Sequence, residues 1–557
     1  MIESGGLSRR AALAAGMAAP IIALPARSAR AATSAPQRPN IETPDTLVID
    51  VAGGRVRGYL SGDIAIFKGI PYAAPTGGDN RFMPPRPVAP WNGTRLCLTP
   101  GPICPQPGEG HGGTPLAFLL QSAPGVQDED CLNLNVWTPG LDSQRRPVMV
   151  WIHGGEFSTG SSLALPACDG EALARRGDVV VVSINHRLNL LGYLDLASVG
   201  APEPFASAAN VGMLDIVAAL HWVRDHAAAF GGDPGNVTLF GQSGGGLKVT
   251  TLCAMPSAAG LFHKAIVQSG SESRVFGREM TEPLARALLA ELQIAPADAA
   301  RLRNVPVETL TAAGAKVVRN WSADWNGNVW KLVGWAPRAG DAIIPASPYE
   351  AASRAYAAPV PLMVGSVRHE FILTMFSLDA ERMTLEDVRA YLGRTFGDPD
   401  QLVAAFTRAY PAEDPVGINA LISAASFNRI NAVNQAKDKA RLGGAPVWLY
   451  RFDWITPMLD GAPHAYHCSD LPMVFASIDH VPEATGTSAR ARAMAATMSD
   501  SWIAFARSGN PNHPGLPHWP SVSADHAPTM AFNDRSAVET DADQELLELV
   551  ASKRKWA

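Results

Sequence analysis

The stretch NVTLFGQSGGGLKVTTLCA, residues 236–254, indicates the fold of this chain most directly. An apolar run ends at Phe240, a G-x-S-x-G sequence follows at 241–245, and a helix-like segment comes next. This order predicts a strand, a sharp turn and a helix, with Ser243 on the turn and its hydroxyl exposed. The flanking positions are glycine because so tight a turn leaves no room for a Cβ against the neighbouring backbone. Ser243 is therefore the candidate nucleophile.

Similar apolar runs recur on both sides of this stretch. They lie at 147–155, 178–187, 265–270, 360–366 and 447–453. Runs of about four to eight residues, rich in β-branched side chains and ended by glycine or polar residues, are typical of strands buried on both faces. Helical patterns separate several of them, most clearly at 210–232. The alternation predicts an α/β fold with a large, mostly parallel sheet flanked by helices.

Composition narrows the class of protein further. The chain has 557 residues, of which 47% are hydrophobic and 18% charged, as is typical of a globular protein with a large core. The formal net charge of −6 argues against a nucleic-acid partner, because phosphates are bound through clustered Lys and Arg. No uninterrupted apolar stretch reaches the roughly 20 residues that a transmembrane segment needs, so we expect none.

Residues 1–31 are typical of an export signal. Ser8-Arg9-Arg10 precedes a small-residue apolar run at 11–24, and Ala29-Arg30-Ala31 has the pattern of a cleavage site. The paired arginines favour the twin-arginine route, which predicts a bacterial protein exported to the periplasm or the medium. The alternative is a frayed, Ala-rich helix on the domain. With the signal set aside, we expect one domain over 32–557.

An activated serine also needs an oxyanion hole and a base. The segment HGGEF, residues 153–157, directly follows an apolar run, and its flexible backbone can aim N–H groups at the charge that develops on a carbonyl oxygen. The acid and the histidine are expected downstream of Ser243, because that is their order in this kind of fold.

Longer motifs resemble the type-B carboxylesterases, a family that includes cholinesterases and bacterial para-nitrobenzyl esterases. They include FKGIPYAAP, EDCLNLNVW, VWIHGGEF, LHWVRDH and GLFHKAIVQSGS, in the same order, and the similarity runs from about residue 47 to residue 535. The resemblance implies an α/β-hydrolase fold and hydrolysis of small-molecule carboxylic esters through an acyl-enzyme on Ser243. It implies neither a metal nor a cofactor.

The resemblance also implies the partners of the serine. Glu370, in the segment GSVRHEF, stands where the family has its acid, although His and Phe replace the usual Asp and Gly beside it. His464 opens the segment HAYHCSDLPMVF and is expected to be the base, with His467 as the alternative. Ser269, in the QSGS segment, matches a serine that supports the triad from behind.

By the same resemblance, the oxyanion hole is formed by the N–H groups of Gly155, Glu156 and Gly244. Three residues here depart from the family pattern. Gln242 replaces Glu, Gly244 replaces Ala, and Glu156 replaces a small residue. An ionised Glu156 facing the oxyanion would oppose it, so we expect this side chain to turn away and hydrogen-bond within the pocket wall.

Six cysteines are present, and spacing alone allows 15 pairings if all are bonded. The resemblance implies a disulfide between Cys104 and Cys131, with Cys97 as a weaker competitor for Cys131. The remaining cysteines are expected to be buried free thiols. They are Cys168, Cys253 and Cys468.

Residues 271–358 are less regular and predict an inserted helical lobe. This segment holds four tryptophans that either pack the lobe or line a substrate entrance. They are Trp321, Trp325, Trp330 and Trp335. We interpret the whole chain as a serine ester hydrolase. A carbamate or amide hydrolase, an interfacial lipase and a non-catalytic, cholinesterase-like binding protein are the alternatives, and the oligomeric state stays open.

Overall fold

The structure is a computed structural model that describes residues 40–107, 125–323, 331 and 333–555. Residues 41–557 form one compact unit. The expected export signal at 1–31 lies outside the described residues, as do Trp325 and Trp330.

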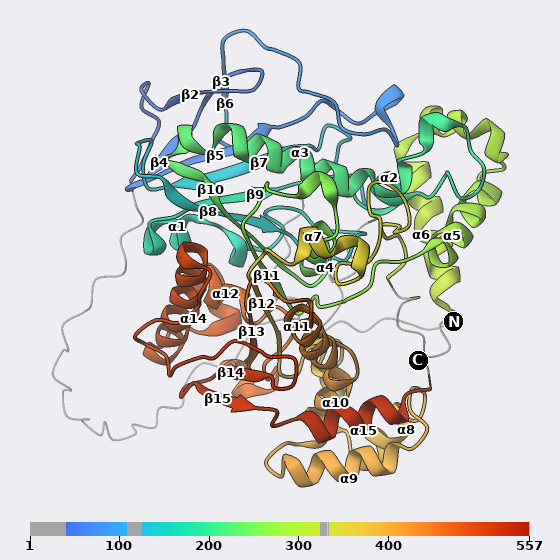
Figure 1. Ribbon diagram of the computed structural model, residues 1–557, viewed down its shortest axis with the longest axis vertical. Helices are drawn as coiled ribbons and strands as arrows, with labels where there is room; N and C mark the ends of the chain where they lie inside the picture. Colours follow the sequence, from blue (N-terminus) through green and yellow to red (C-terminus); the bar gives the residue numbers. More distant parts are fainter. Residues whose placement is uncertain (1–39, 108–124, 324–330, 332, 556–557) are drawn as a thin grey trace, which may run out of the picture. The chain divides into compact units, whose positions relative to one another are not determined.

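A twelve-stranded sheet forms the centre of this unit (Figure 1). The strand order is β1-β4-β5-β7-β9-β8-β10-β11-β12-β13-β14-β15. From β9 through β14 in that order every neighbouring pair is parallel, whereas the strands at both edges pair antiparallel. The predicted α/β class with a mostly parallel sheet is therefore confirmed.

The strands of this sheet include all the apolar runs predicted from the sequence. Their bounds are β1 Ile41–Glu42, β4 Tyr59–Ser61, β5 Ile64–Pro71, β7 Asn133–Thr138, β8 Arg146–Ile152, β9 Val180–Ile184, β10 Gly232–Gln242, β11 Lys264–Gln268, β12 Leu362–Val367, β13 Val447–Phe452, β14 Pro528–Phe532 and β15 Ala537–Thr540. A separate three-stranded sheet consists of β2 Val48–Val51, β3 Gly54–Arg57 and β6 Thr94–Leu96.

Helices lie on both sides of the large sheet (Figure 1). Their bounds are α1 Glu171–Gly177, α2 Asn189–Tyr193, α3 Val211–His226, α4 Gly244–Leu252, α5 Arg278–Glu291, α6 Val307–Ala323, α7 Arg354–Ala357, α8 Leu385–Leu392, α9 Pro399–Ala409, α10 Pro415–Ala424, α11 Ile430–Leu442, α12 Leu471–Val474, α13 Pro482–Thr485, α14 Ala489–Ser508 and α15 Gln544–Lys553. Within the predicted lobe at 271–358, the helices α5 and α6 form a pair.

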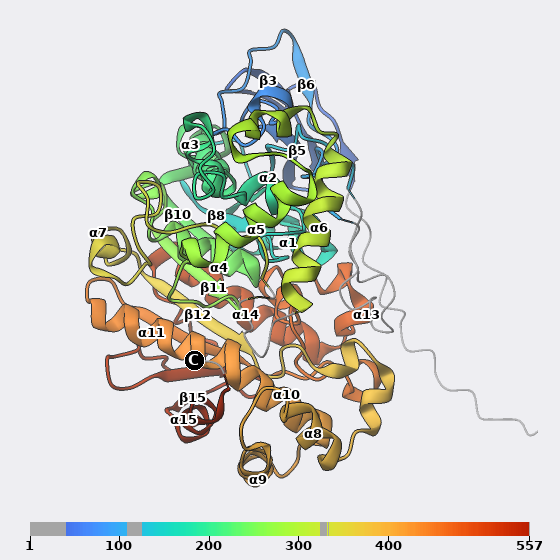
Figure 2. The same cartoon turned by 90° about the vertical axis from the view of Figure 1, so that its right-hand side faces the viewer.

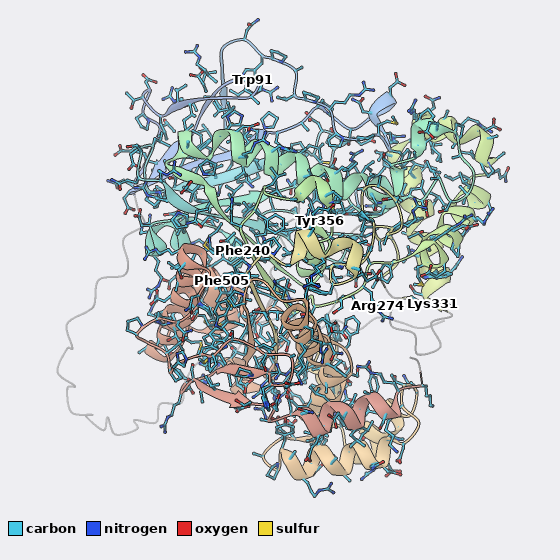
Figure 3. All side chains as sticks on the ribbon, viewed as in Figure 1. Trp91, Phe240, Arg274, Lys331, Tyr356 and Phe505 are labelled. Carbon is cyan, nitrogen blue, oxygen red and sulfur yellow. The ribbon has the colours of Figure 1, made fainter. Side chains whose placement is uncertain are left out.

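Alternation along the strands divides the core into two layers, because successive side chains of a strand point to opposite faces. In β8, Val148 and Val150 join the layer that contains α3, α4 and α11, whereas Met149 and Trp151 join the layer that contains α1 and α14. Phe240 of β10 and Phe505 of α14, both labelled in Figure 3, belong to the second layer. A third, smaller apolar cluster joins α8, α9, α10 and α15 at one end of the unit (Figure 2).

One helical stretch, Glu203–Phe230, is long and apolar enough to span a membrane by length and composition. It contains α3, and 72% of its most apolar window is buried inside the protein. Such burial is what the core helix of a folded domain shows.

Candidate active site

The serine turn lies at the carboxyl edge of the parallel strands. β10 ends at Gln242 and α4 begins at Gly244, so Ser243 alone makes the turn, at φ +57° and ψ −126°. This is a strained conformation for a residue with a side chain. The Ser243 N–H donates to the Gln268 carbonyl at the end of β11, 2.8 Å away, and this bond anchors the turn. A Cβ on Gly245 would lie 2.0 Å from the Ile152 carbonyl oxygen, so glycine is required there.

Glu370 and His467 form a buried pair beside this turn. The Nδ1 atom of His467 lies 2.6 Å from the Oε2 atom of Glu370. The other carboxylate oxygen, Oε1, accepts the Val367 N–H at 3.2 Å. Glu370 is 1% exposed, so little water competes for its oxygens. The pairing keeps the ring proton on Nδ1 and leaves Nε2 as the atom that can accept a proton.

The structure corrects the expectation that His464 pairs with Glu370. Its Nδ1 atom lies 3.7 Å from Glu413 Oε2, and its Nε2 atom lies 3.7 Å from Asp414 Oδ2. The reason is the register of the backbone: Tyr466 forms a parallel bridge with Glu370, and the His467 N–H donates to the Glu370 carbonyl. This register brings His467, rather than the residue three positions earlier, to the carboxylate.

Ser269 contacts the strand that precedes the acid. Its hydroxyl accepts the Val367 N–H at 3.3 Å, and the same N–H also donates to Glu370. Its own N–H donates to the Gly365 carbonyl at 2.8 Å. Ser269 therefore connects the end of β11 to β12, the strand that ends three residues before Glu370.

A cavity of about 310 Å³ opens onto the serine and the histidine. Its wall combines the glycine-rich loop after β8 with several apolar side chains. The lining residues include Ser243, His467, Gly155, Glu156, Trp151, Leu165, Phe371, Met375, Phe376 and Leu471. The Phe371 ring stacks on the His467 imidazole, with centroids 4.1 Å apart and 29° between the ring planes. The residue that replaces the usual glycine after the acid thus covers one face of the histidine.

Gln242 forms a hydrogen bond with Nε2 of His467, the ring nitrogen that does not contact Glu370. Its amide nitrogen lies 3.0 Å from His467 Nε2, and its amide oxygen accepts from the Cys468 thiol at 3.3 Å. Because the Nδ1 proton goes to Glu370, the Gln242 amide donates to Nε2. In the described part of the chain, no hydrogen bond joins the Ser243 hydroxyl to His467. Such bonds are often long without substrate and tighten when it binds.

The glycine-rich loop after β8 lies directly against the serine turn. Gly155 and Glu156 have positive φ values, +83° and +55°. A Cβ on Gly244 would lie 2.2 Å from both the nitrogen and the Cα of Glu156. The family's usual alanine therefore does not fit at position 244 unless this loop moves. The close contact brings the predicted oxyanion-hole residues to Ser243.

The hydrogen bond expected between the Glu156 side chain and the pocket wall is absent from the described residues. Glu156 is exposed where it lines the cavity. Desolvation by the surrounding protein groups raises the pKa of the carboxyl to about 7, against the opposing effects of Lys248 and His467.

The predicted disulfide is absent, and all six cysteines are free thiols. Cys104 and Cys131 are buried and their thiols are hydrogen-bonded neighbours. The Cys104 sulfur also accepts the Leu188 N–H at 3.2 Å. The neighbouring thiol and burial raise the pKa of Cys131 well above its usual value, which disfavours the reactive thiolate.

His369, Glu413 and His464 form a cluster whose potential ligand atoms all lie within 4.8 Å of one another. Glu413 is already paired with Arg368, 3.0 Å away, and with His369 Nε2, 3.2 Å away. His369 Nδ1 accepts the Ala465 N–H at 3.4 Å, so the ring proton resides on Nε2, the atom that faces Glu413. These bonds favour a structural network behind Glu370 over a set of metal ligands.

Lys248, a buried residue of α4, is not among the functional residues predicted from the sequence. Its ammonium group donates to the carbonyls of His153 and Glu156 in the loop after β8. The only sequence signal was a lysine in an otherwise apolar and small-residue helix.

A strained serine between a parallel strand and a helix, an acid after a later strand and a histidine beyond it define an α/β-hydrolase. The chain belongs to the carboxylesterase family, whose model matches residues 45–549. It is therefore a serine hydrolase of carboxylic esters.

Individual relatives cover nearly the whole chain. Para-nitrobenzyl esterase of Bacillus subtilis is 34% identical over 500 residues, which are 89% of this chain and 97% of the relative. Phenmedipham hydrolase of Pseudarthrobacter oxydans is also 34% identical, over 88% of this chain and 96% of the relative. Among solved structures, a Clostridium hathewayi esterase described as hydrolysing aliphatic aromatic polyesters is 36% identical, with a TM-score of 0.78 and coverage of 92% and 99%.

Proposed function

We propose that this carboxylesterase acts through a triad of Ser243, His467 and Glu370. The observation that carries the proposal is the 2.6 Å contact between Glu370 and His467, in a cavity that also exposes Ser243. The oxyanion hole consists of the N–H groups of Gly155, Glu156 and Gly244, on two segments that lie in contact.

The reaction follows from these positions. As the Ser243 oxygen attacks the acyl carbon, its proton moves to His467 Nε2, and Glu370 stabilises the charged imidazole. The substrate's carbonyl oxygen gains the negative charge, which the oxyanion hole holds. His467 then protonates the leaving alcohol, and water repeats the cycle on the acyl-enzyme. For the first step Nε2 must exchange the Gln242 amide for the serine hydroxyl.

The cavity favours esters with apolar or aromatic groups. Phe371, Met375 and Phe376 line one part of it, and Phe371 and Phe376 remain 48% and 45% exposed. A substrate with apolar groups would cover these rings and remove apolar surface from water, which favours binding. One relative is named phenmedipham hydrolase. Carbamates are therefore tested beside the esters, as the alternative class of substrate.

The test is hydrolysis of para-nitrophenyl esters of increasing acyl length by the mature chain and its Ser243→Ala variant. We expect activity on esters with apolar acyl groups and its loss in the variant. Labelling by an organophosphate at Ser243, read by mass spectrometry, identifies the nucleophile. Labelling at another residue, or full activity of a folded Ser243→Ala protein, would contradict the proposal.

We further propose that residues 1–31 direct export through the twin-arginine route. The support is the sequence Ser8-Arg9-Arg10 followed by an apolar run and a cleavage-site pattern. Replacement of Arg9 and Arg10 by Lys should leave the precursor in the cytoplasm of a bacterial host, as fractionation would show. Unchanged export of that variant would argue for a different route.

A further inference from the structure

Lys248 lies directly beneath the loop that is proposed to hold the oxyanion. It belongs to α4, the helix that begins after Ser243, and is fully buried. Its ammonium group donates to the His153 carbonyl at 3.2 Å and to the Glu156 carbonyl at hydrogen-bond distance. The two acceptors are the first and last residues of the segment 153–156.

The hydrogen bonds of this lysine differ from those of a buried ion pair. Among the described residues both of its acceptors are backbone carbonyls, and Nζ lies over the Phe157 ring, 5.4 Å from its centroid. Burial of an amine is costly unless it is hydrogen-bonded. Burial lowers the pKa of Lys248 to about 7, although the Glu156 carboxyl acts in the opposite direction. An apolar side chain of similar length would avoid this cost but would leave both carbonyls without a donor.

Lys248 holds the carbonyls at the two ends of this segment. Between them, the Gly155 carbonyl accepts the N–H groups of Ser158 and Thr159 at 3.1 and 3.0 Å, and the Gly154 carbonyl lies 2.8 Å from His153 Nδ1. Each peptide unit is planar, so a held carbonyl also sets the direction of the N–H in the same unit. Lys248 holds the units before Gly154 and after Glu156. Only two peptide units lie between them, and these carry the N–H groups of Gly155 and Glu156. The bonds within the loop fix its internal shape, and the two bonds from Lys248 tie both ends of that shape to α4, the helix that begins after Ser243.

We propose that Lys248 is a positioning residue, which holds segment 153–156 so that the N–H groups of Gly155 and Glu156 point at the substrate's carbonyl oxygen. The inference rests on the proposed oxyanion hole. Lys248 reaches neither the substrate nor the reacting atoms, and acts through the backbone of this loop.

The test compares Lys248→Met with a matched control, Lys439→Met. Lys439 of α11 is also buried, and its ammonium group donates to the carbonyls of Ala358 and Ala445 at 2.8 and 3.0 Å. None of these control residues lines the cavity. Both substitutions therefore remove a buried lysine that holds two carbonyls, but only one of them concerns the proposed oxyanion hole.

Two readouts separate positioning from mere stability. The first is the kinetic split on a para-nitrophenyl ester, for which we expect kcat to fall about 10²-fold in Lys248→Met with KM changed little. The second is inhibition by a trifluoromethyl ketone. Here Ser243 oxygen bonds to the carbonyl carbon, the serine proton moves to His467, and the carbonyl electron pair leaves the oxygen negatively charged. In Lys248→Met, affinity for the ketone should fall in parallel with kcat. Lys439→Met should keep the wild-type values of both quantities.

Wild-type kcat and ketone affinity in a folded Lys248→Met protein would overturn the inference, and so would equal losses in the two variants. If Lys248→Met does not fold, Lys248→Gln is measured instead, since it keeps a polar group in the buried site on a shorter side chain without the charge. Wild-type kcat in that protein would also overturn the inference. If wild-type enzyme itself forms no adduct at Ser243, the proposed function fails, not the role of Lys248.

Discussion

The Nδ1 atom of His467 lies 2.6 Å from Oε2 of Glu370, and both residues are buried. The backbone makes the same connection, since the His467 N–H donates to the Glu370 carbonyl at 2.7 Å. Two independent hydrogen bonds therefore fix the imidazole relative to the acid, which is the arrangement that a general base of this type needs.

His467→Ala should lower kcat/KM on a para-nitrophenyl ester by about 10⁴-fold, because the serine then has no base. His464→Ala removes a group that contacts Glu413 and Asp414 rather than the triad, so it should lower thermal stability and leave kcat/KM within about tenfold of wild type. The opposite ranking of the two variants would restore His464 as the base.

Gln242→Glu should move the acid limb of the kcat/KM–pH profile to higher pH, by about one unit. The substitution places a carboxylate where an amide now donates to His467 Nε2, and a negative charge there favours the protonated imidazole, which cannot act as a base. The measurement is kcat/KM from pH 5 to pH 9. Gln242→Met keeps the volume without charge and should not produce this shift. An unchanged limb in the Glu variant would place Gln242 away from the base in solution.

Glu156 should give the enzyme a preference for cationic over neutral esters that increases with pH. Desolvation by the surrounding protein groups raises the pKa of its carboxyl to about 7, so the negative charge is present above that pH and lost below it. The ratio of kcat/KM for a 2-(trimethylammonio)ethyl ester to that for its neutral 3,3-dimethylbutyl isostere should therefore rise as the pH passes from about 6 to about 8.

Glu156→Gln is the matched control for this preference, because it keeps the shape and removes the charge. In that variant the ratio should stay flat with pH, while activity on the neutral ester is retained. A ratio that still rises in the variant would assign the preference to another residue.

Phe371→Ala should lower kcat about tenfold, because the imidazole of His467 loses the ring that stacks on it at 4.1 Å and can rotate away from the serine. Phe371→Tyr keeps the ring and should retain most of kcat. Equal kcat values in the Ala variant and wild type would show that Glu370 alone is enough to orient the histidine.

The sequence predicted the elements that depend on local pattern. The run ending at Phe240 and the glycines around Ser243 predicted the strand and the turn, because both follow from burial and from the space that a Cβ needs. The choice between His464 and His467 depends on which residue pairs with Glu370 across two loops. No local pattern encodes that register, and the resemblance to a family suggested the other histidine.

Two further features of the structure differ from the expectations drawn from the sequence, and both also depend on contacts between distant segments. The resemblance implied a disulfide between Cys104 and Cys131, and the structure brings the two thiols together without a bond. The reach of Lys248 to two loop carbonyls depends on how closely α4 approaches the segment after β8. That distance is set by packing between segments almost 100 residues apart, which spacing along the chain does not report.

The missing side chain at Gly244 has a consequence for engineering. Because the Glu156 backbone fills the space where a Cβ would lie, the serine turn and the loop opposite interlock and cannot be exchanged one at a time. A chimera that imports the alanine of a related esterase at position 244 would need that relative's loop as well. Libraries that aim to change selectivity here should therefore transplant the two segments as one cassette.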